Sequence, residues 1–321
     1  MQIYNDFPLD KILWYKIGGK AKTFIQASNS EDLKEALEFI VNNEFSRIFI
    51  CGLGSNLIFS DANFDGVVLQ IVSTGKPEVE LLPDGRVKAF GGVVFDHVIQ
   101  AALQNNLVGI GWAGGLPGTI GAGVRGNVGA FGGEIKDIVD EVEVIELEGS
   151  KLSVYSQKKE DLSFSYRHSL IKEKKNLFVS NVTLKLQKGT DKELESEREA
   201  YITNIAYRKN HHPLEYPNCG SVFKNIKGEE NVGKVLSVWP DIKESVETKW
   251  HGKVAMGYVI KRLGLSGKRV GNAQISEKHS NFIVNLGGAK AKDVFTIIHE
   301  IQEKAQETFG FTPEVEVEIV E

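Results

Sequence analysis

The feature that most constrains this chain is a glycine-rich stretch at residues 113–134, where nine of the 22 positions are glycine. Leucine, isoleucine, valine, phenylalanine, proline, threonine and arginine are interleaved at irregular spacing. Each glycine loses more backbone freedom on folding than any other residue, so such a run suits a backbone that adopts positive φ or approaches a large ligand. A backbone with few side chains offers many N–H donors, which favours binding of phosphates and a flat ring system.

A second glycine segment lies upstream at residues 48–59, where an apolar strand runs through Gly-Leu-Gly-Ser-Asn (52–56) into another apolar run. A Rossmann dinucleotide motif is disfavoured because the third glycine is missing and residues 57–61 are typical of strand or turn. We expect a tight strand–loop–strand turn whose amides face an anion. A flexible linker is disfavoured for residues 113–134, because linkers lack such large apolar residues.

Bulk properties narrow the class of protein. The 321 residues suffice for two or three domains. There are 38 basic and 43 acidic residues and no basic stripe, which disfavours a nucleic-acid partner. No apolar run approaches the roughly 18 residues of a membrane span, and no signal-peptide pattern opens the chain. Cys51 and Cys219 lack disulfide-framework or metal-ligand spacing, which predicts a reduced, cytoplasmic protein without a metal.

The hydrophobic pattern predicts an α+β protein. Its first lobe is a β-α-β unit with strands at residues 23–27 and 48–50, and a helix that begins near Asn29 or Ser30. Further strands are predicted at residues 67–71, 87–91, 141–147, 152–155, 177–187, 281–285 and 312–320, and helices at 94–106, 193–210 and 293–309, the last ending before Gly310, with another helix ending at 258–264. The predicted domains are residues 1–66, 67–200 and 201–321.

Two polar motifs could carry chemistry, and each has an ordinary structural alternative. Arg167, within Tyr-Arg-His-Ser (166–169), is either a surface ion-pair former or a fixed cation over a developing carboxylate or enolate charge. Ser221 follows Gly220 in a turn, and the sequence after it does not fit a nucleophile elbow. If Ser221 acts, proton donation fits better than covalent attack. Cys219 is interpreted as a small packed residue.

Three further polar segments are ambiguous. The basic cluster at residues 208–212 is either surface decoration or a diphosphate clamp. The cluster at residues 276–281 is either a solvated turn or part of a site, and His279 alone does not make a metal site. Glu314 alternates with Glu316 and Glu318, which places the three on one face of the expected strand.

Taken together, these segments resemble the UDP-N-acetylenolpyruvoylglucosamine reductase (MurB) family, flavoenzymes of bacterial peptidoglycan synthesis. The resemblance extends from about Trp14 to Val320, and the order and spacing of the motifs are more specific than any one of them. The motifs lie at residues 17–21, 52–57, 115–121, 127–134, 166–169, 220–225, 267–285 and 313–315. The chain more closely resembles the subgroup with Ser-Glu-Lys-His before the late strand, which lacks an extra tyrosine-bearing loop.

The resemblance implies a two-lobed FAD-binding module of the PCMH/VAO type and a C-terminal α+β substrate-binding domain. It implies NADPH as reductant and an enolpyruvyl UDP-sugar as substrate, in a reaction that supports cell-wall biogenesis, cell shape and division. The residues implied to bind FAD are Gly52, Gly54, Ser55, Asn56, Leu57, Gly115, Pro117, Gly118, Thr119, Gly121 and Gly123. No protein partner is implied.

The same resemblance implies roles for five other residues. Ser221 would protonate the substrate carbon, and Arg167 and Glu314 would hold and stabilise its enolic carboxylate. Lys209 and Asn225 would contact the UDP diphosphate.

Several positions depart from the family pattern. Leu53 replaces a third consecutive glycine, Cys219 replaces alanine, and Gly126 and Val128 flank Asn127 where methionine and alanine are more usual. Residues 226–254 look like an insertion that could reshape a substrate lid. Two alternatives stay open at this point: a related flavin oxidase acting on another alcohol or lactone, and a non-catalytic protein that binds a flavin or sugar nucleotide.

Overall fold

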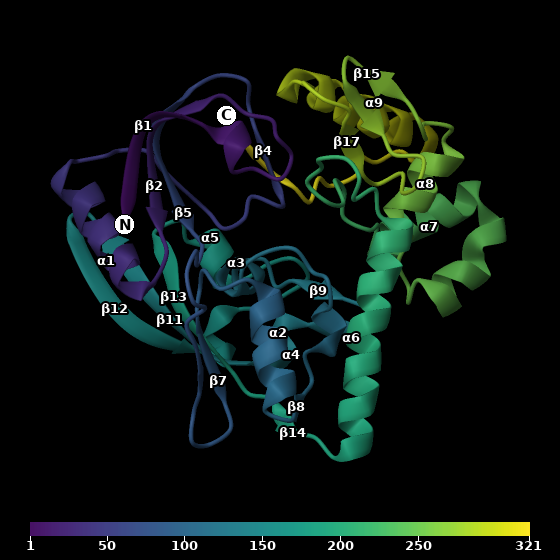
Figure 1. Cartoon of the computed structure of the whole chain (residues 1–321). Coiled ribbons are helices and arrows are strands. Elements are labelled where there is room, and N and C mark those ends of the chain that lie inside the picture. The colour runs from purple at the N-terminus through teal and green to yellow at the C-terminus, as the bar shows by residue number, and fades with distance from the viewer. The chain divides into compact units, whose positions relative to one another are not determined.

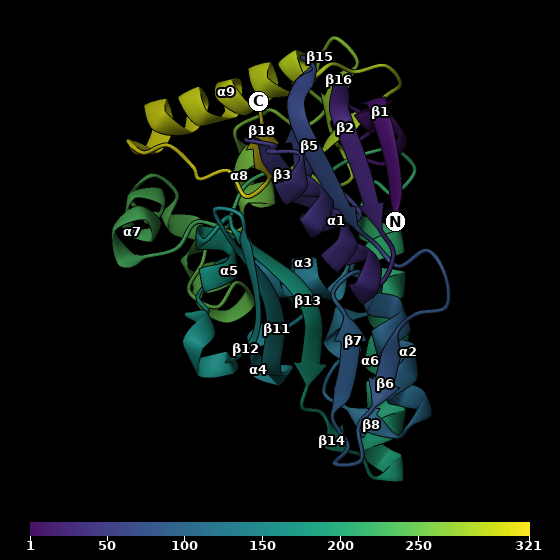
Figure 2. The ribbon, with the colours of Figure 1, turned by 90° about the vertical axis from the view of Figure 1, so that its left-hand side faces the viewer.

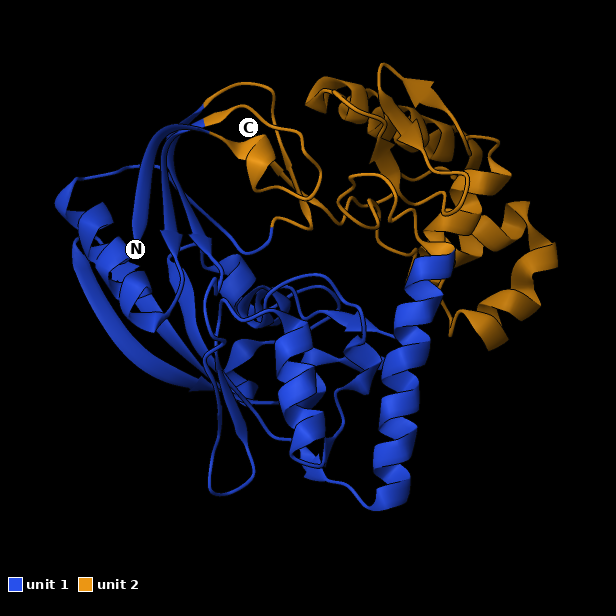
Figure 3. Ribbon diagram, viewed as in Figure 1, with its two compact units in different colours: residues 1–7, 21–53, 64–210 blue, residues 8–20, 54–63, 211–321 orange.

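The computed structural model describes residues 1–321, which divide into two compact units (Figure 3). Unit 1 contains residues 1–7, 21–53 and 64–210, and unit 2 contains residues 8–20, 54–63 and 211–321. Each unit is thus assembled from three separate stretches of chain. The three domains expected from the sequence are two FAD-binding lobes and a substrate-binding domain, which are defined by their ligands and not by compactness. Their boundaries stay a prediction. Every helix is too short or too polar to cross a lipid bilayer.

The first sheet of unit 1 confirms the predicted β-α-β unit. Its strand order is β1 (Gln2–Pro8), β2 (Lys20–Ala27), β5 (Phe64–Ile71), β3 (Ile48–Cys51), and both β2 and β3 run parallel to β5. Helix α1 (Ser30–Asn42) begins as expected, because the Asn29 side chain accepts a hydrogen bond from the Asp32 amide at 2.7 Å.

The second sheet of unit 1 is antiparallel, with β12, β11, β13 and β7 side by side (Figure 2). Its strand order is β12 (Lys151–Lys158), β11 (Val139–Glu148), β13 (Leu177–Leu184), β7 (Val87–Phe90), β6 (Val79–Leu81). The helices of this unit also include α2 (Phe95–Gln104), α4 (Ile135–Ile138), α5 (Leu170–Glu173) and α6 (Asp191–His211), drawn in Figure 1. One hydrophobic core joins both sheets, since Ile25, Val67 and Val142 belong to one buried cluster.

The glycine-rich stretch is less extended than a glycine-lined ligand loop predicts, because a short helix interrupts it. Helix α3 (Ile120–Arg125) is capped by Thr119, whose hydroxyl accepts from the Ala122 amide at 3.4 Å. The other short elements of unit 1 are β8 (Leu107–Val108), η2 (Gly111–Ala113), β9 (Gly129–Ala130), β10 (Gly133–Glu134), η3 (Lys159–Leu162) and β14 (Gln187–Lys188).

Unit 2 has its own core beneath helices α8 (Met256–Arg262) and α9 (Ala291–Phe309). Gly310 ends α9 in the left-handed conformation, as predicted. The remaining elements are η1 (Leu9–Lys11), β4 (Leu57–Phe59), α7 (Glu229–Val238), η4 (Pro240–Ile242), η5 (Ser245–Lys249), β15 (Arg269–Val270), β16 (Ala273–Ile275), β17 (Ile283–Asn285) and β18 (Glu318–Val320).

Two segments of unit 2 bear on the sequence expectations. The strand predicted over residues 312–320 is too long, because only β18 is continuous and pairs with β4 in parallel. Pro313 has no N–H to donate, and Val315 forms only an isolated bridge with Phe223. Residues 226–254 fold mainly as helical turns, and Trp239 lies under the Arg262 guanidinium of α8 at 4.6 Å.

Candidate functional site

The loop before α3 presents backbone donors that the chain does not use. The amides of Gly115, Gly118 and Thr119 donate to no acceptor in the protein, whereas the Leu116 amide bonds the Ala113 carbonyl at 2.9 Å. Gly115 and Gly118 have φ of +68° and +138°, so both occupy conformations that favour glycine. Unpartnered successive amides form an anion-binding concavity. The adjacent amides of Gly118 and Thr119 meet this condition, so the loop suits the diphosphate or the polar ring edge of FAD.

The glycines inside α3 have an internal packing reason. A Cβ at Gly121 would lie 2.8 Å from the Gly91 carbonyl oxygen, and one at Gly123 would lie 2.4 Å from the Phe95 ring. A Cβ at Gly52 would similarly lie 2.7 Å from the Thr119 hydroxyl. The structure thus explains these glycines by close approach of backbone and side chains, and their predicted contacts with FAD stay a prediction.

The other predicted FAD residues of the first glycine segment lie in unit 2. Gly54 has φ of +67°, and a Cβ there would lie 2.7 Å from the Leu13 side chain. The Asn56 carbonyl accepts from the Glu318 amide at 3.1 Å, and Leu57 is the first residue of β4. This segment is therefore ordered by the C-terminal strand.

Arg208 is a residue of unit 1 that sequence reasoning placed only within a basic cluster. Its Nε donates to the Gly114 carbonyl at 3.1 Å, and its guanidinium lies 5.1 Å from the Phe131 ring. Its buried Nη2 has no hydrogen-bond partner. Burial lowers the pKa of Arg208 to about 10, so it remains a cation at neutral pH. The sequence feature that could have indicated Arg208 is the glycine loop, because Arg208 contacts that loop at Gly115.

Arg167 sits at the tip of a tight turn in unit 1. Ser165 and His168 close the turn by exchanging backbone hydrogen bonds of 3.1 Å each, and Arg167 has φ of +58°. The Arg167 Nη2 donates to the Gly129 carbonyl at 3.0 Å, and Lys172 Nζ donates to the Arg167 carbonyl at 3.1 Å. The predicted cation is thus held at both its backbone and its side chain.

Buried Asn127 links this turn to the glycine-rich stretch. Its Nδ2 donates to the Ser165 carbonyl at 2.8 Å and to a Glu134 carboxylate oxygen at 3.1 Å. Its Oδ1 accepts from the Lys136 amide at 3.3 Å. Burial raises the pKa of Glu134, but hydrogen bonds from Lys136 and Asn127 and the charges of Lys136 and Arg167 outweigh it and leave this pKa lowered.

Ser221 lies in unit 2, at the start of a short extended segment. Gly220 before it has φ of +82°, and the Gly220 amide donates to the Asn218 side chain at 3.0 Å. After it, the Val222 amide donates to the Asn281 carbonyl at 2.8 Å. The Val222 carbonyl accepts from the Glu316 amide at 2.8 Å. The serine backbone is therefore fixed from both sides.

Asn281 completes the support of this segment. Its Oδ1 accepts from the Phe223 amide at 3.0 Å, and its Nδ2 donates to the Phe223 carbonyl at 2.8 Å. The Nδ1 of His279, two residues earlier, accepts from the Asn281 amide at 3.3 Å. Burial lowers the pKa of His279, with His211 adding to the effect. The polar cluster at residues 276–281 thus supports the Ser221 segment from beneath.

Glu314 lies beside the same segment, so the structure brings the predicted residues Ser221 and Glu314 into one part of unit 2. The Lys224 amide donates to the Glu314 carbonyl at 3.0 Å, and Lys224 Nζ forms an ion pair with the Glu314 carboxylate. Arg167 belongs to unit 1. Sequence reasoning did not select Lys224 individually, although the motif at residues 220–225 contains it.

The two predicted substrate-binding residues have different surroundings. Asn225 is exposed, but its Oδ1 accepts from the Met256 amide at 3.1 Å and so satisfies the first turn of α8. Lys209 is exposed near the end of α6 in unit 1. Their contacts with a UDP diphosphate stay predictions.

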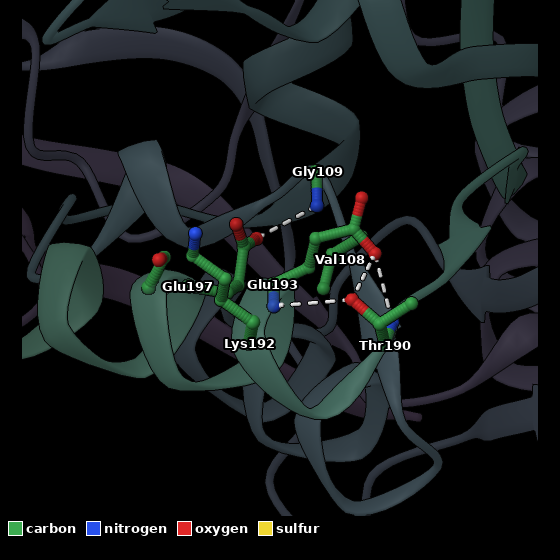
Figure 4. Close-up of a pocket in the computed structure, with 7 residues that line it drawn as sticks. Val108, Gly109, Thr190, Lys192, Glu193 and Glu197 are labelled. Carbon is green, nitrogen blue, oxygen red and sulfur yellow. Dashed lines mark hydrogen bonds between the residues drawn. The ribbon is translucent and has the colours of Figure 1, made fainter.

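A pocket of about 640 Å³ opens at the start of α6, and none of the predicted site residues lines it (Figure 4). The Glu197 carboxylate beside it accepts from the amides of Gly109, Ile110 and Gly111 at 2.7, 2.7 and 2.5 Å. The Glu193 carboxylate accepts from the Thr190 amide and hydroxyl at 2.8 Å each. Glu193 thus caps the start of α6 and Glu197 ties the helix to residues 109–111, which explains both carboxylates without a ligand.

Two family models match the chain. The C-terminal domain of UDP-N-acetylenolpyruvoylglucosamine reductase matches residues 212–320, and an FAD binding domain matches residues 21–154. The fold class predicted from the sequence, α+β with an FAD-binding module and a separate C-terminal domain, is confirmed.

Named relatives match over the whole length. UDP-N-acetylenolpyruvoylglucosamine reductase of Caldicellulosiruptor saccharolyticus is 33% identical over 320 residues, covering 100% of this chain and 92% of the relative. The same enzyme of Lactobacillus helveticus is also 33% identical, covering 100% and 95%. The crystal structure of the MurB enzyme of Thermus caldophilus superposes with a TM-score of 0.72 at 26% identity, covering 100% and 98%. The chain therefore belongs to the UDP-N-acetylenolpyruvoylglucosamine reductase family.

Proposed function

We propose that this protein reduces UDP-N-acetylglucosamine enolpyruvate to UDP-N-acetylmuramate, with FAD as cofactor and NADPH as reductant. The observation that carries the proposal is the match to named reductases over the whole chain, 100% of it at 33% identity. The free amides of Gly115, Gly118 and Thr119 support FAD as the cofactor. The product is a precursor of peptidoglycan, so the reaction serves cell-wall biogenesis and, with it, cell division.

The cytoplasmic location expected from the sequence belongs to this proposal. Its support is that Cys51 and Cys219 are both free thiols, as is usual in a reducing compartment. Membership in the subgroup without the tyrosine-bearing loop remains part of the proposal as well.

The proposed chemistry assigns each residue a charge or a proton. Bound FAD supplies a hydride, which it takes from NADPH. Hydride addition to the vinyl CH2 carbon of the substrate leaves negative charge on the neighbouring carbon and its carboxylate. Arg167 would stabilise that charge, because a preorganised cation lowers the barrier where charge develops. Ser221 would donate the proton to the neighbouring carbon, and Glu314 would help to hold the carboxylate.

Anaerobic stopped-flow absorbance tests the proposal in two steps, using wild type and Ser221→Ala. NADPH should bleach the flavin in both proteins. Addition of the enolpyruvyl substrate should restore the oxidised spectrum quickly in wild type and at least about a hundredfold more slowly in Ser221→Ala, since the proton donor is absent. Ser237→Ala is the matched control, because the Ser237 hydroxyl only bonds the Lys234 carbonyl within α7.

Three other outcomes would count against the proposal in different ways. Bleaching without recovery in wild type would indicate a flavoprotein with another electron acceptor. Equal loss of both steps in Ser221→Ala would contradict the role of Ser221. A colourless protein that cannot be reconstituted with FAD would favour a non-catalytic binding protein.

A further inference from the structure

The ion pair between Lys224 and Glu314 is not explained by the fold of unit 2. The Lys224 side chain is only 18% exposed, although lysine is usually solvated, whereas the Glu314 side chain is 66% exposed. Lys224 Nζ has no partner other than Glu314. A largely buried lysine whose one polar contact is an exposed carboxylate contributes little to the core. Its position indicates that it holds the carboxylate in place.

The backbone fixes this pair in place. The Lys224 amide donates to the Glu314 carbonyl at 3.0 Å, and Phe223 forms a bridge with Val315. The carbonyl of Pro313 accepts from Gln302 of α9 at 3.1 Å. The two side chains therefore start from neighbouring backbone positions that α9 and the Ser221 segment both hold. Little freedom is lost when the ion pair forms, because its partners are already adjacent.

The ion pair changes the charge that Glu314 presents to a substrate. The substrate in the proposed reaction carries a carboxylate, and its negative charge spreads further when hydride is added. An isolated Glu314 carboxylate beside it would repel that charge. A lysine in contact with Glu314 makes the pair neutral overall, so that Glu314 can approach an anionic group.

We propose that Lys224 is a positioning residue that holds and neutralises the Glu314 carboxylate for the anionic substrate. This inference rests on the proposed function, since the role of Glu314 in holding the substrate carboxylate is part of that proposal. It adds a residue whose charge, and not merely its bulk, determines how well Glu314 acts.

A double-mutant cycle tests the inference. Lys224→Gln should lower the rate of substrate reduction about tenfold, which is usual for coupled residues in contact. The same substitution should leave flavin bleaching by NADPH unchanged. Lys224→Arg, which keeps the charge, should recover most of the rate. In a Glu314→Gln background, Lys224→Gln should cause no further loss, because the group through which it acts is gone.

The control is Lys234→Gln, which removes a lysine of the same unit that pairs with Glu230. It should leave both steps at the wild-type rate. Additive losses in the cycle, or equal losses in Lys224→Gln and Lys224→Arg, would overturn the inference and leave only a structural role for Lys224.

A second measurement does not depend on turnover. Titration of the product, UDP-N-acetylmuramate, into the oxidised protein reports its Kd through the flavin absorbance. Lys224→Gln should weaken product binding about tenfold when Glu314 is intact. In the Glu314→Gln variant, the same substitution should leave product binding unchanged. Equal weakening in both would overturn the inference. If wild type bound no product and reduced no substrate, the proposed function would fail first, and the two failures are thereby distinguished.

Discussion

A buried asparagine supports each of two predicted catalytic positions, but the two supports are built differently. In unit 1, Asn127 bonds the Ser165 carbonyl behind the turn that carries Arg167, and it also bonds the charged Glu134. In unit 2, Asn281 bonds both backbone groups of Phe223, two residues after Ser221. The cation is therefore supported through a network that contains charges, and the serine through neutral backbone pairing.

This difference suits the two roles. A residue that stabilises charge needs its own electrostatic surroundings set, and Glu134 and Lys136 lie in the network behind Arg167. A proton donor needs a backbone that places its hydroxyl, and backbone pairing on both sides of Val222 holds the segment that carries Ser221 without adding charge. We therefore expect substitutions that displace the Ser221 segment of unit 2 to destabilise the protein at every pH. For substitutions that remove a charge behind Arg167 in unit 1, we expect the loss of stability to depend on pH.

The largest effect is expected for Asn281→Leu. The substitution leaves the buried amide and carbonyl of Phe223 without partners, and each unsatisfied group costs about 1–3 kcal/mol. We expect the free energy of unfolding to fall by about 3 kcal/mol, with at least a tenfold loss of substrate reduction. Urea unfolding followed by tryptophan fluorescence measures the first and stopped flow the second. Asn272→Leu is the matched control, because it also loses two side-chain bonds, to the Gly287 carbonyl and from Arg269, but both bonds are exposed, so we expect about 1 kcal/mol.

If Asn281→Leu were as stable as the Asn272→Leu control, the neutral support of Ser221 would be no stronger than an ordinary surface bond. The comparison between the two units would then lose its basis.

A smaller effect is expected at Asn127, where two causes can be separated. Asn127 has φ of +40°, which glycine adopts without cost and alanine does not. Asn127→Gly should lose the side-chain bonds, about 2 kcal/mol, and some backbone entropy on folding. Asn127→Ala should be less stable than the glycine variant by about 0.5–1 kcal/mol, because left-handed strain exceeds that entropy cost. Thermal unfolding of the two variants gives the difference. Equal stability of the glycine and alanine variants would show that the backbone relaxes.

The sequence predicted most of the fold, because its signals there are local. The Asn29 cap, the apolar spacing of α9 and Gly310 at its end each follow from neighbouring residues, and the structure confirms them. The strand expected over residues 312–320 was wrong in length, because its partners lie far away in sequence: Glu316 pairs with Val222, and β18 with β4.

The surroundings of the predicted site residues could not be predicted for the same reason. The bond from Asn281 to Phe223 spans 58 positions, and the pair of Lys224 and Glu314 spans 90. Motif matching selected Ser221, Arg167 and Glu314 as residue types in order. It could not show that Arg208 contacts the glycine loop, or that Asn225 caps a helix, because those contacts depend on tertiary packing.

The smallest expected effect, and the sharpest test of the comparison, is the pH dependence of Glu134→Gln. The pKa of Glu134 is lowered in the folded protein, so the unfolded chain binds the proton at higher pH. The stability that this carboxylate contributes is present above the ordinary glutamate pKa of about 4.3 and is lost as pH falls through the lowered value.

Wild type should therefore exceed Glu134→Gln by about 1 kcal/mol at pH 7, an amount typical of a partly exposed charged pair, and by progressively less below about pH 4.5. The penalty of Asn281→Leu should change less over the same range, since the lost amide side chain does not titrate and the bond to His279 is made by the backbone, which the substitution keeps. Urea unfolding at pH 7, 5 and 4 gives both differences. A Glu134 difference that grew on acidification, or an Asn281 penalty that fell with it, would remove the distinction between a charged support for Arg167 and a neutral one for Ser221.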